Sequence, residues 1–243
     1  MKTFSLFTII LCCNTILFSQ PSTFLVKAGT NAAMALPKTF RYLYPEYQDG
    51  YLLLWSGKKS SVSKYNYDML NRSLIFINEK NDTLTITNDE AVRFAHIGNE
   101  DFLHDHKMGY LKLIIDDSLH MLASHEQLEE VRHTQAGSNG YGTVDVGSSY
   151  SAQRRTSIRW VRDFDVTYGR VVEYYLIDQG RTIIKADKSG FLDMFSRHEG
   201  YVKSYMKKEN IDFKKEEDSA KHEYPITTSH QLLYTAISEI QYL

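Results

Sequence analysis

Residues 110–122, YLKLIIDDSLHML, decide the fold class because they read as two short strands joined by a turn. Tyr110–Ile115 and Leu119–Leu122 are apolar runs, and Asp117-Ser118 joins them tightly enough to predict a β-hairpin. Similar strand-like runs precede this hairpin. They are Tyr51–Trp55, Val62–Tyr67, Leu74–Ile77, Thr83–Thr87 and Val92–Ile97. Their regular spacing favours an antiparallel meander over parallel βαβ units.

Two features indicate a sheet with a buried face and a second β region. In Thr83–Thr87 the aliphatic Leu84 and Ile86 share one face and the threonines the other, as a half-buried strand requires. Arg170–Lys185 is again strand-like and contains a turn in which we expect Gly180 to take a positive φ angle. Because an isolated hairpin is barely stable in water, we expect this region to extend the first sheet.

After Asp187 the apolar residues recur at intervals of three and four, which predicts amphipathic helices. The residues concerned are Phe191, Leu192, Phe195, Tyr201, Val202, Tyr205 and Met206. We expect two short helices, divided near Gly200 or packed in sequence. Thr228 and Gln231 have capping-box spacing before a last helix. With strands first and helices last, the sequence predicts an α+β fold: an antiparallel sheet with C-terminal helices packed on it.

The N-terminal segment predicts export. Lys2 precedes an apolar core from Phe4 to Phe18 and then polar residues up to Gln20, which is the order of a secretory signal peptide. The apolar core is interrupted and shorter than the roughly 20 residues of a membrane-spanning helix. We therefore expect residues 1–20 to be a cleaved signal peptide and residues 21–243 to be a single α+β domain. The location would be the periplasm, the outer membrane surface or the medium.

Charge and cysteine content exclude several functional classes. The chain carries a formal charge of −2, and loss of Lys2 with the signal leaves −3, so we expect no nucleic-acid partner. Both cysteines, Cys12 and Cys13, lie within the expected signal peptide. The mature domain would then have no disulfide, no thiolate-bound zinc and no cysteine nucleophile. A Gly-x-Ser-x-Gly elbow is also absent. We expect no cofactor and no transmembrane segment after the signal.

His104 and His106 are the candidate metal ligands. Within a strand the two side chains would share a face, which lets two imidazoles reach one ion. A third ligand depends on the strand pairing, and surface histidines in a turn explain the same residues without a metal. His125–Glu129 holds half of a zinc-protease motif, but Glu129 stands where the second histidine belongs. We interpret this segment as a polar strand or a helix edge.

Residues 134–159 are rich in glycine and serine and predict a flexible surface loop, or one that covers a ligand or binds a partner. Gly137–Gly142 lacks the Lys-Ser/Thr pair of a phosphate-binding loop. Arginines gather around Trp160 at the end of this stretch. They are Arg154, Arg155, Arg159 and Arg162. Guanidinium groups bind carboxylate and phosphate bidentately, which suggests an envelope protein, an acidic glycan or a lipid headgroup as partner. The alternative is an ordinary charged loop balanced by Asp163 and Asp165.

Other residues could also meet a ligand. Asp163, Asp165 and Glu173 could supply the carboxylate pair that glycoside hydrolysis needs. The seventeen tyrosines could stack on sugars. Several of them lie in strand-like runs, where aromatic side chains serve cross-strand pairing and packing, and we expect that role.

Several short segments resemble a group of exported bacterial proteins of unknown function. They are Tyr65-Asn66-Tyr67, Leu74-Ile75-Phe76, Ile97-Gly98 leading to Phe102, Tyr141-Gly142, and the tail from Ile211 to Asp218. The resemblance implies export and a bacterial envelope setting. It implies no activity, so no functional residue is carried over.

These observations lead to two functional hypotheses. The first is a non-enzymatic envelope or secreted protein that binds or assembles with another macromolecule, with residues 134–159 and the following arginines as the contact region. The alternative is a metal-dependent or carboxylate-based hydrolase of envelope material, for which His104 and His106 are the residues to test. The lack of a complete catalytic constellation in the sequence favours the first hypothesis.

Overall fold

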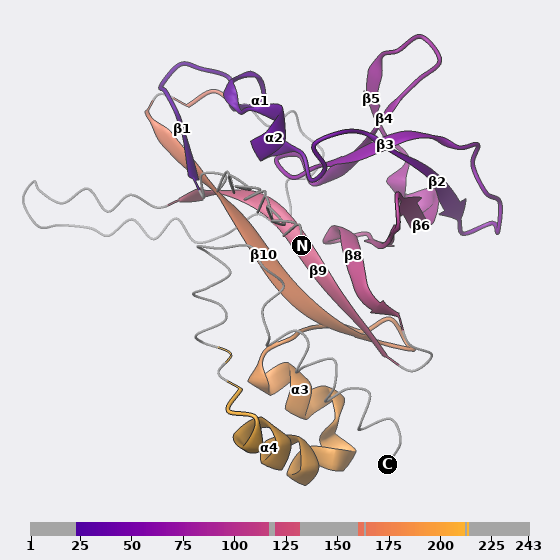
Figure 1. Cartoon of the computed structure of the whole chain (residues 1–243), viewed down its shortest axis with the longest axis vertical. Coiled ribbons are helices and arrows are strands. Elements are labelled where there is room, and N and C mark those ends of the chain that lie inside the picture. The colour runs from indigo at the N-terminus through magenta and orange to yellow at the C-terminus, as the bar shows by residue number, and fades with distance from the viewer. Residues whose placement is uncertain (1–22, 117–119, 132–159, 163, 212, 214–243) are drawn as a thin grey trace, which may run out of the picture.

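The computed structural model describes residues 23–116, 120–131, 160–162, 164–211 and 213. Within these residues eleven strands form one sheet, and every strand pairing in it is antiparallel (Figure 1). Helices follow the last strand and pack against the sheet. The predicted α+β class, with an antiparallel sheet and C-terminal helices, is confirmed. No helix in this described part of the chain is long and apolar enough to cross a membrane.

The sheet consists of two meanders joined at β2 and β6. The strands are β1 (Thr23–Val26), β2 (Gln48–Leu54), β3 (Ser63–Asp68), β4 (Ser73–Ile77), β5 (Thr83–Thr85), β6 (Val92–Ile97), β7 (Glu100–Asp105), β8 (Gly109–Asp116), β9 (His120–Val131), β10 (Val166–Asp178) and β11 (Ile183–Lys185). Their order is β1-β10-β9-β8-β7-β6-β2-β3-β4-β5, and β11 pairs with β10 outside this path. Each meander therefore runs in chain order, β2 to β5 and β6 to β10.

Four helices in the described part of the chain flank the sheet. They are α1 (Ala32–Ala35), α2 (Lys38–Arg41), α3 (Lys188–Met194) and α4 (Glu199–Lys208), with 3-10 turns at Asp89–Ala91 and Ser196–His198. The second 3-10 turn separates α3 from α4, so the predicted division near Gly200 is confirmed to within a few residues. The last helix predicted after Thr228 lies outside the described residues.

The strands predicted between residues 51 and 122 all overlap observed strands, whereas β1 and β7 were not predicted. β7 opens with the acidic Glu100-Asp101, which hides its β pattern in the sequence. The buried face expected for Thr83–Thr87 is wrong at Leu84, which is 42% exposed. β5 ends the sheet and pairs with β4 only, so just Ile86 of the two aliphatic residues packs against the core.

The second β region extends the first sheet, as predicted, because β10 pairs with β9 and β11 pairs with β10. The expectation that Gly180 takes a positive φ is wrong: Arg181 holds that conformation, with φ 61°. Asp178 sets the turn, since its backbone carbonyl accepts from Arg181 N at 3.0 Å and its Oδ1 accepts from Thr182 N at 2.7 Å. The left-handed residue is therefore an arginine, which is uncommon for a residue with a Cβ atom.

Two of the three apolar cores of the described residues lie at opposite ends of the long strands β9 and β10, and the third contains Leu103, Leu111, Ala123 and Ile177. At one end α3 and α4 cover Leu122 and Leu176 with apolar side chains that include Phe191 and Val202. At the other end Leu128 belongs to a larger core. This core also takes in Tyr65, Tyr67, Tyr168 and side chains of α1 and α2. The expectation that strand tyrosines serve packing is confirmed at Tyr65 and Tyr67, which are buried. Figure 1 shows the two helix pairs at the two ends of these strands.

A buried ionic network lies along β9 between the cores. Glu126 accepts from Arg170 Nη2 at 2.6 Å, and its other oxygen lies 3.3 Å from Lys112 Nζ. Lys112 also approaches Glu100 at 3.3 Å, and the hydroxyl of Tyr44 donates to Glu100. Burial, followed by this hydrogen bond, raises the pKa of Tyr44 above its usual range. Each charge in the network thus has partners, which a buried charge requires.

The network lies in the segment interpreted from the sequence as a polar strand or helix edge. The strand is confirmed as part of β9, but its burial was not predicted: His125, Glu126 and Gln127 are 3–5% exposed. Polar residue types normally mark a surface, and here the charge of Glu126 is compensated within the sheet by Arg170 and Lys112 on neighbouring strands.

Asp68 ties α2 to the turn between β3 and β4. Its carboxylate is 1% exposed and accepts from Arg41 Nε at 3.1 Å, from Leu70 N at 3.1 Å and from Asn71 Nδ2 at 2.7 Å. Although burial lowers the pKa of Arg41, the hydrogen bond and charge of Asp68 raise it above its ordinary value. The guanidinium group of Arg41 therefore stays charged inside the protein.

Asp68→Ala should lower the free energy of unfolding by about 3–5 kcal/mol, because it leaves the buried Arg41 charge uncompensated. Asp49→Ala is the matched control. Asp49 pairs with Lys64 at 2.9 Å with both side chains more than half exposed, and such a pair contributes at most about 1 kcal/mol. Urea unfolding followed by circular dichroism measures both. Equal losses in the two variants would contradict the assigned role of Asp68.

Arg181→Gly and Arg181→Val should differ in stability, although both remove the guanidinium group. Glycine adopts the left-handed conformation freely, whereas a side chain with a Cβ costs roughly 1–2 kcal/mol there. We expect the glycine variant to be the more stable by about that amount in thermal unfolding. A valine variant as stable as the glycine variant would show that residue 181 does not hold this conformation.

Candidate anion-binding site

The structure does not bring the two candidate metal ligands together. His104 is buried at the end of β7, with its ring 4.8 Å from that of Tyr110 and its Nε2 3.5 Å from Asp89. β7 ends at Asp105, and the side chain of His106 is 71% exposed in the turn that follows. The expectation that both imidazoles share a face is wrong because the strand stops between them. Among the described residues no group of three His, Cys, Asp or Glu side chains is arranged to hold a metal ion.

The arginines predicted to form a contact region are described only at Arg162, which pairs with Glu130 at 2.8 Å. The other three lie outside the described residues, as do residues 134–159 and Asp163. Asp165 accepts from Lys27 Nζ at 2.7 Å and from Ala28 N, and these contacts lower the pKa of its carboxyl group. Glu173 accepts from the hydroxyl of Tyr175. Eight residues of extended chain span roughly 26 Å, so Asp165 and Glu173 form no carboxylate pair.

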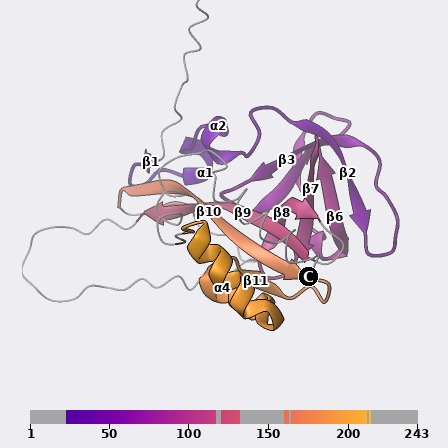
Figure 2. The same ribbon diagram turned by 60° about the horizontal axis from the view of Figure 1, so that its bottom comes forward.

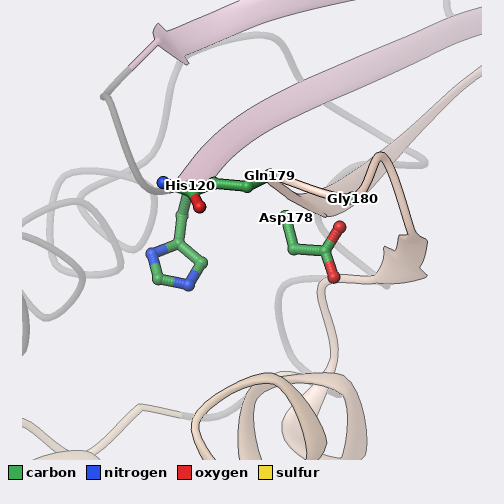
Figure 3. A pocket seen from close by; sticks show the side chains of 4 residues that line it. All are labelled: His120, Asp178, Gln179 and Gly180. Carbon is green, nitrogen blue, oxygen red and sulfur yellow. The ribbon is translucent and has the colours of Figure 1, made fainter.

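Two cavities offer alternative sites. The smaller, of about 270 Å³, is lined by His120, Asp178, Gln179 and Gly180 where β9 and β10 end (Figure 3). Asp178 is engaged by its own turn, and the ring of His120 lies 4.9 Å from that of Phe195. The larger, of about 700 Å³, is lined mainly by apolar residues of β2, β3 and β4 and the segment around Ile86. The smaller cavity therefore offers one carboxylate, Asp178, and the larger has no charged lining residue.

An arginine cluster on the sheet combines positive charge with an exposed surface. We define it as Trp55, Arg93, Phe94 and Arg181. The guanidinium carbon of Arg181 lies 4.5 Å from the centre of the Trp55 ring and 5.4 Å from that of Phe94. The guanidinium carbon of Arg93 lies 5.6 Å and 5.3 Å from the same two rings. Trp55 is 54% exposed, so the cluster faces solvent.

Backbone irregularities orient the side chains of both arginines. Leu53 pairs with Phe94 and Leu54 with Val92, so the register of β2 on β6 skips Arg93. Such a β-bulge redirects a side chain, and it allows Arg93 to share the rings of Phe94 and Trp55. Arg181 reaches the same rings from the left-handed turn between β10 and β11. Two departures from regular geometry thus converge on one place, which is typical of functional sites.

The electrostatics of the cluster favour an anion. No ion pair joins Arg93 or Arg181 to a carboxylate of the described residues; their recorded neighbours are aromatic rings. Burial, followed by the charge of Arg93, lowers the pKa of Arg181. Aromatic faces attract cations without neutralising them, so the two guanidinium groups remain positive and repel one another. A ligand carboxylate or phosphate would relieve that repulsion and accept from both forks.

Sequence analysis did not identify this cluster. Trp55 and Arg93 lie in predicted strands, and Arg181 begins the strand-like run that follows the predicted turn. These three residues are far apart in the sequence and form no motif. The only local signals were a tryptophan at a strand end and an arginine directly after the glycine of a turn. The bulge that redirects Arg93 becomes visible only in the strand pairing.

Comparison of the chain with known protein families, with curated proteins and with solved structures finds no match. The function therefore has to be argued from the geometry of the arginine cluster. The resemblance to exported bacterial proteins stays a prediction.

Proposed function

We propose that this protein is a binding protein for an acidic glycan and that the arginine cluster is the binding site. The observation that supports this most directly is the pair of guanidinium groups held on Trp55 and Phe94 without a carboxylate partner among the described residues. The proposal retains the first functional hypothesis and moves its contact region from the stretch after residue 134 to β2, β6 and the β10–β11 turn.

The chemistry of the cluster suits a carboxylate on a sugar ring. Each guanidinium presents a planar fork that matches a carboxylate bidentately, and the exposed indole of Trp55 offers a flat surface beside it. The aromatic rings hold the arginine side chains in place before the ligand arrives, which reduces the entropy lost on binding. The predicted export would bring such a site among the acidic glycans of a cell envelope.

Charge argues against nucleic acid as the ligand. The chain as a whole is slightly acidic, with a formal charge of −2, so it offers no broad positive field to a densely charged polymer. The positive charge is local to the cluster. A few well-placed cations suit a ligand that carries its charges on separate units.

The double substitution Arg93→Gln, Arg181→Gln should weaken binding of a galacturonate trimer at least tenfold. A hydrogen bond to a charged group contributes roughly 1.5–3 kcal/mol, and about 1.4 kcal/mol is a factor of ten in affinity. Isothermal titration calorimetry measures the change, and binding should weaken as salt rises because the site is exposed.

The matched control is the double substitution Lys203→Gln, Lys208→Gln on α4, which removes the same amount of charge. These two lysines are far from the cluster in sequence and pair with glutamates of their own region. We expect it to bind like the original protein, and a neutral galactose trimer to bind neither protein. Equal affinity in the arginine variant and the control variant would refute the proposed site.

A further inference from the structure

We propose that a second cationic subsite, formed by Tyr51, Lys59 and His96, continues the arginine cluster along the same face of the sheet, so that the ligand is a linear polyanion spanning both. This inference rests on the proposed function. It adds that the natural ligand is a chain of several acidic sugars, and that a single acidic sugar occupies only part of the site.

The second subsite repeats the construction of the first. Lys59 Nζ lies 3.3 Å from the centre of the Tyr51 ring. The rings of Tyr51 and His96 are 5.0 Å apart, at paired positions of β2 and β6. His96 Nδ1 lies 2.7 Å from Asp101 Oδ1 on the next strand, β7, which orients the imidazole. No ion pair joins Lys59 to a carboxylate of the described residues. Its ammonium group, like the arginines, is held by an aromatic ring.

The strand geometry places the two subsites on one face. Side chains alternate along a strand, so Tyr51 and Leu53 of β2 point to the same side of the sheet, and Leu53 also pairs with Lys59. Leu53 pairs with Phe94 of the arginine cluster, and Tyr51 pairs with His96 of the second subsite. β2, β6 and β7 lie side by side in the sheet (Figure 2). Tyr51 and Leu53 are two residues apart, which corresponds to about 7 Å along an extended strand.

Three cations therefore lie on aromatic supports on this face: Lys59 on Tyr51, and Arg93 with Arg181 on Trp55 and Phe94. Their small number selects the ligand. A nucleic-acid strand carries a charge about every 3.4 Å, a density that three cations on one face do not match. A polymer whose carboxylates sit on successive sugar units can bind Lys59 and the two arginines at the same time. Its uncharged parts can then lie over the apolar stretch around Leu53.

Two linked subsites predict a dependence on ligand length. Once one end of a chain is bound, the other end is held at high effective concentration near the second subsite, which raises affinity without any new kind of contact. Ligands too short to reach from the arginine cluster to Lys59 gain no affinity from the second subsite. The affinity should therefore rise in a step when the chain becomes long enough to span both.

The test measures the affinity of galacturonate oligomers of one to six units by calorimetry on the full protein and three variants. The variants are Lys59→Gln, the double variant Arg93→Gln, Arg181→Gln, and Lys203→Gln as a control of equal charge to the first. We expect a rise of about tenfold or more above a threshold length. Lys59→Gln should abolish this step and leave the shortest ligands unaffected, and Lys203→Gln should behave like the original protein.

The outcomes separate the two proposals. If the shortest oligomers depend on the arginines but no step occurs, or the step persists in Lys59→Gln, the second subsite is refuted and the proposed function stands. If no oligomer binds, or if the affinity is unchanged when the arginines are replaced, the proposed function is refuted, and the second subsite with it. Tighter binding of a single-stranded oligonucleotide, or of vesicles containing an anionic phospholipid, than of the hexamer would overturn the assignment to a glycan.

Discussion

The pairing of β9 with β10 is the constraint on which the rest of the structure depends. Val131 to His120 pair with Thr167 to Asp178 without a register shift, so one long ladder connects the apolar core beside α1 and α2 with the one beside α3 and α4. Glu126 lies within it and is held by Arg170 of β10 and Lys112 of β8. A one-residue slip would move Glu126 to the other face and leave its charge without these partners. The buried charge therefore specifies the register.

The same ladder positions the arginine cluster. Because β10 runs to Asp178 beside His120, the turn to β11 begins at a defined point and turns Arg181 toward Phe94 on β6. The strands between β9 and β6 pair in chain order, which sets the distance that Arg181 has to cross. The β-bulge between β2 and β6 then brings Arg93 to the same rings. The candidate site is thus assembled from both meanders.

Much of the fold could be predicted because its signals are local. Val92–Ile97 was predicted with the bounds that the structure shows, and the period change after Asp187 correctly separated helices from strands. Predictions failed where a distant partner decides whether a residue is in a strand or is buried. β7 is hidden by its acidic start, Leu84 is exposed because β5 ends the sheet, and the polar run around Glu126 is buried because Arg170 and Lys112 compensate it.

The sequence by itself determined the α+β class and the antiparallel meander, because side-chain periodicity and turn residues act over a few neighbouring positions. It also predicted a binding protein with guanidinium groups as the contact chemistry, and the proposed site keeps this chemistry at other arginines. Only the tertiary structure decided which cations gather. Trp55, Arg93 and Arg181 meet through strand order, a register shift and a left-handed turn. These depend on long-range pairing, which local sequence patterns do not encode.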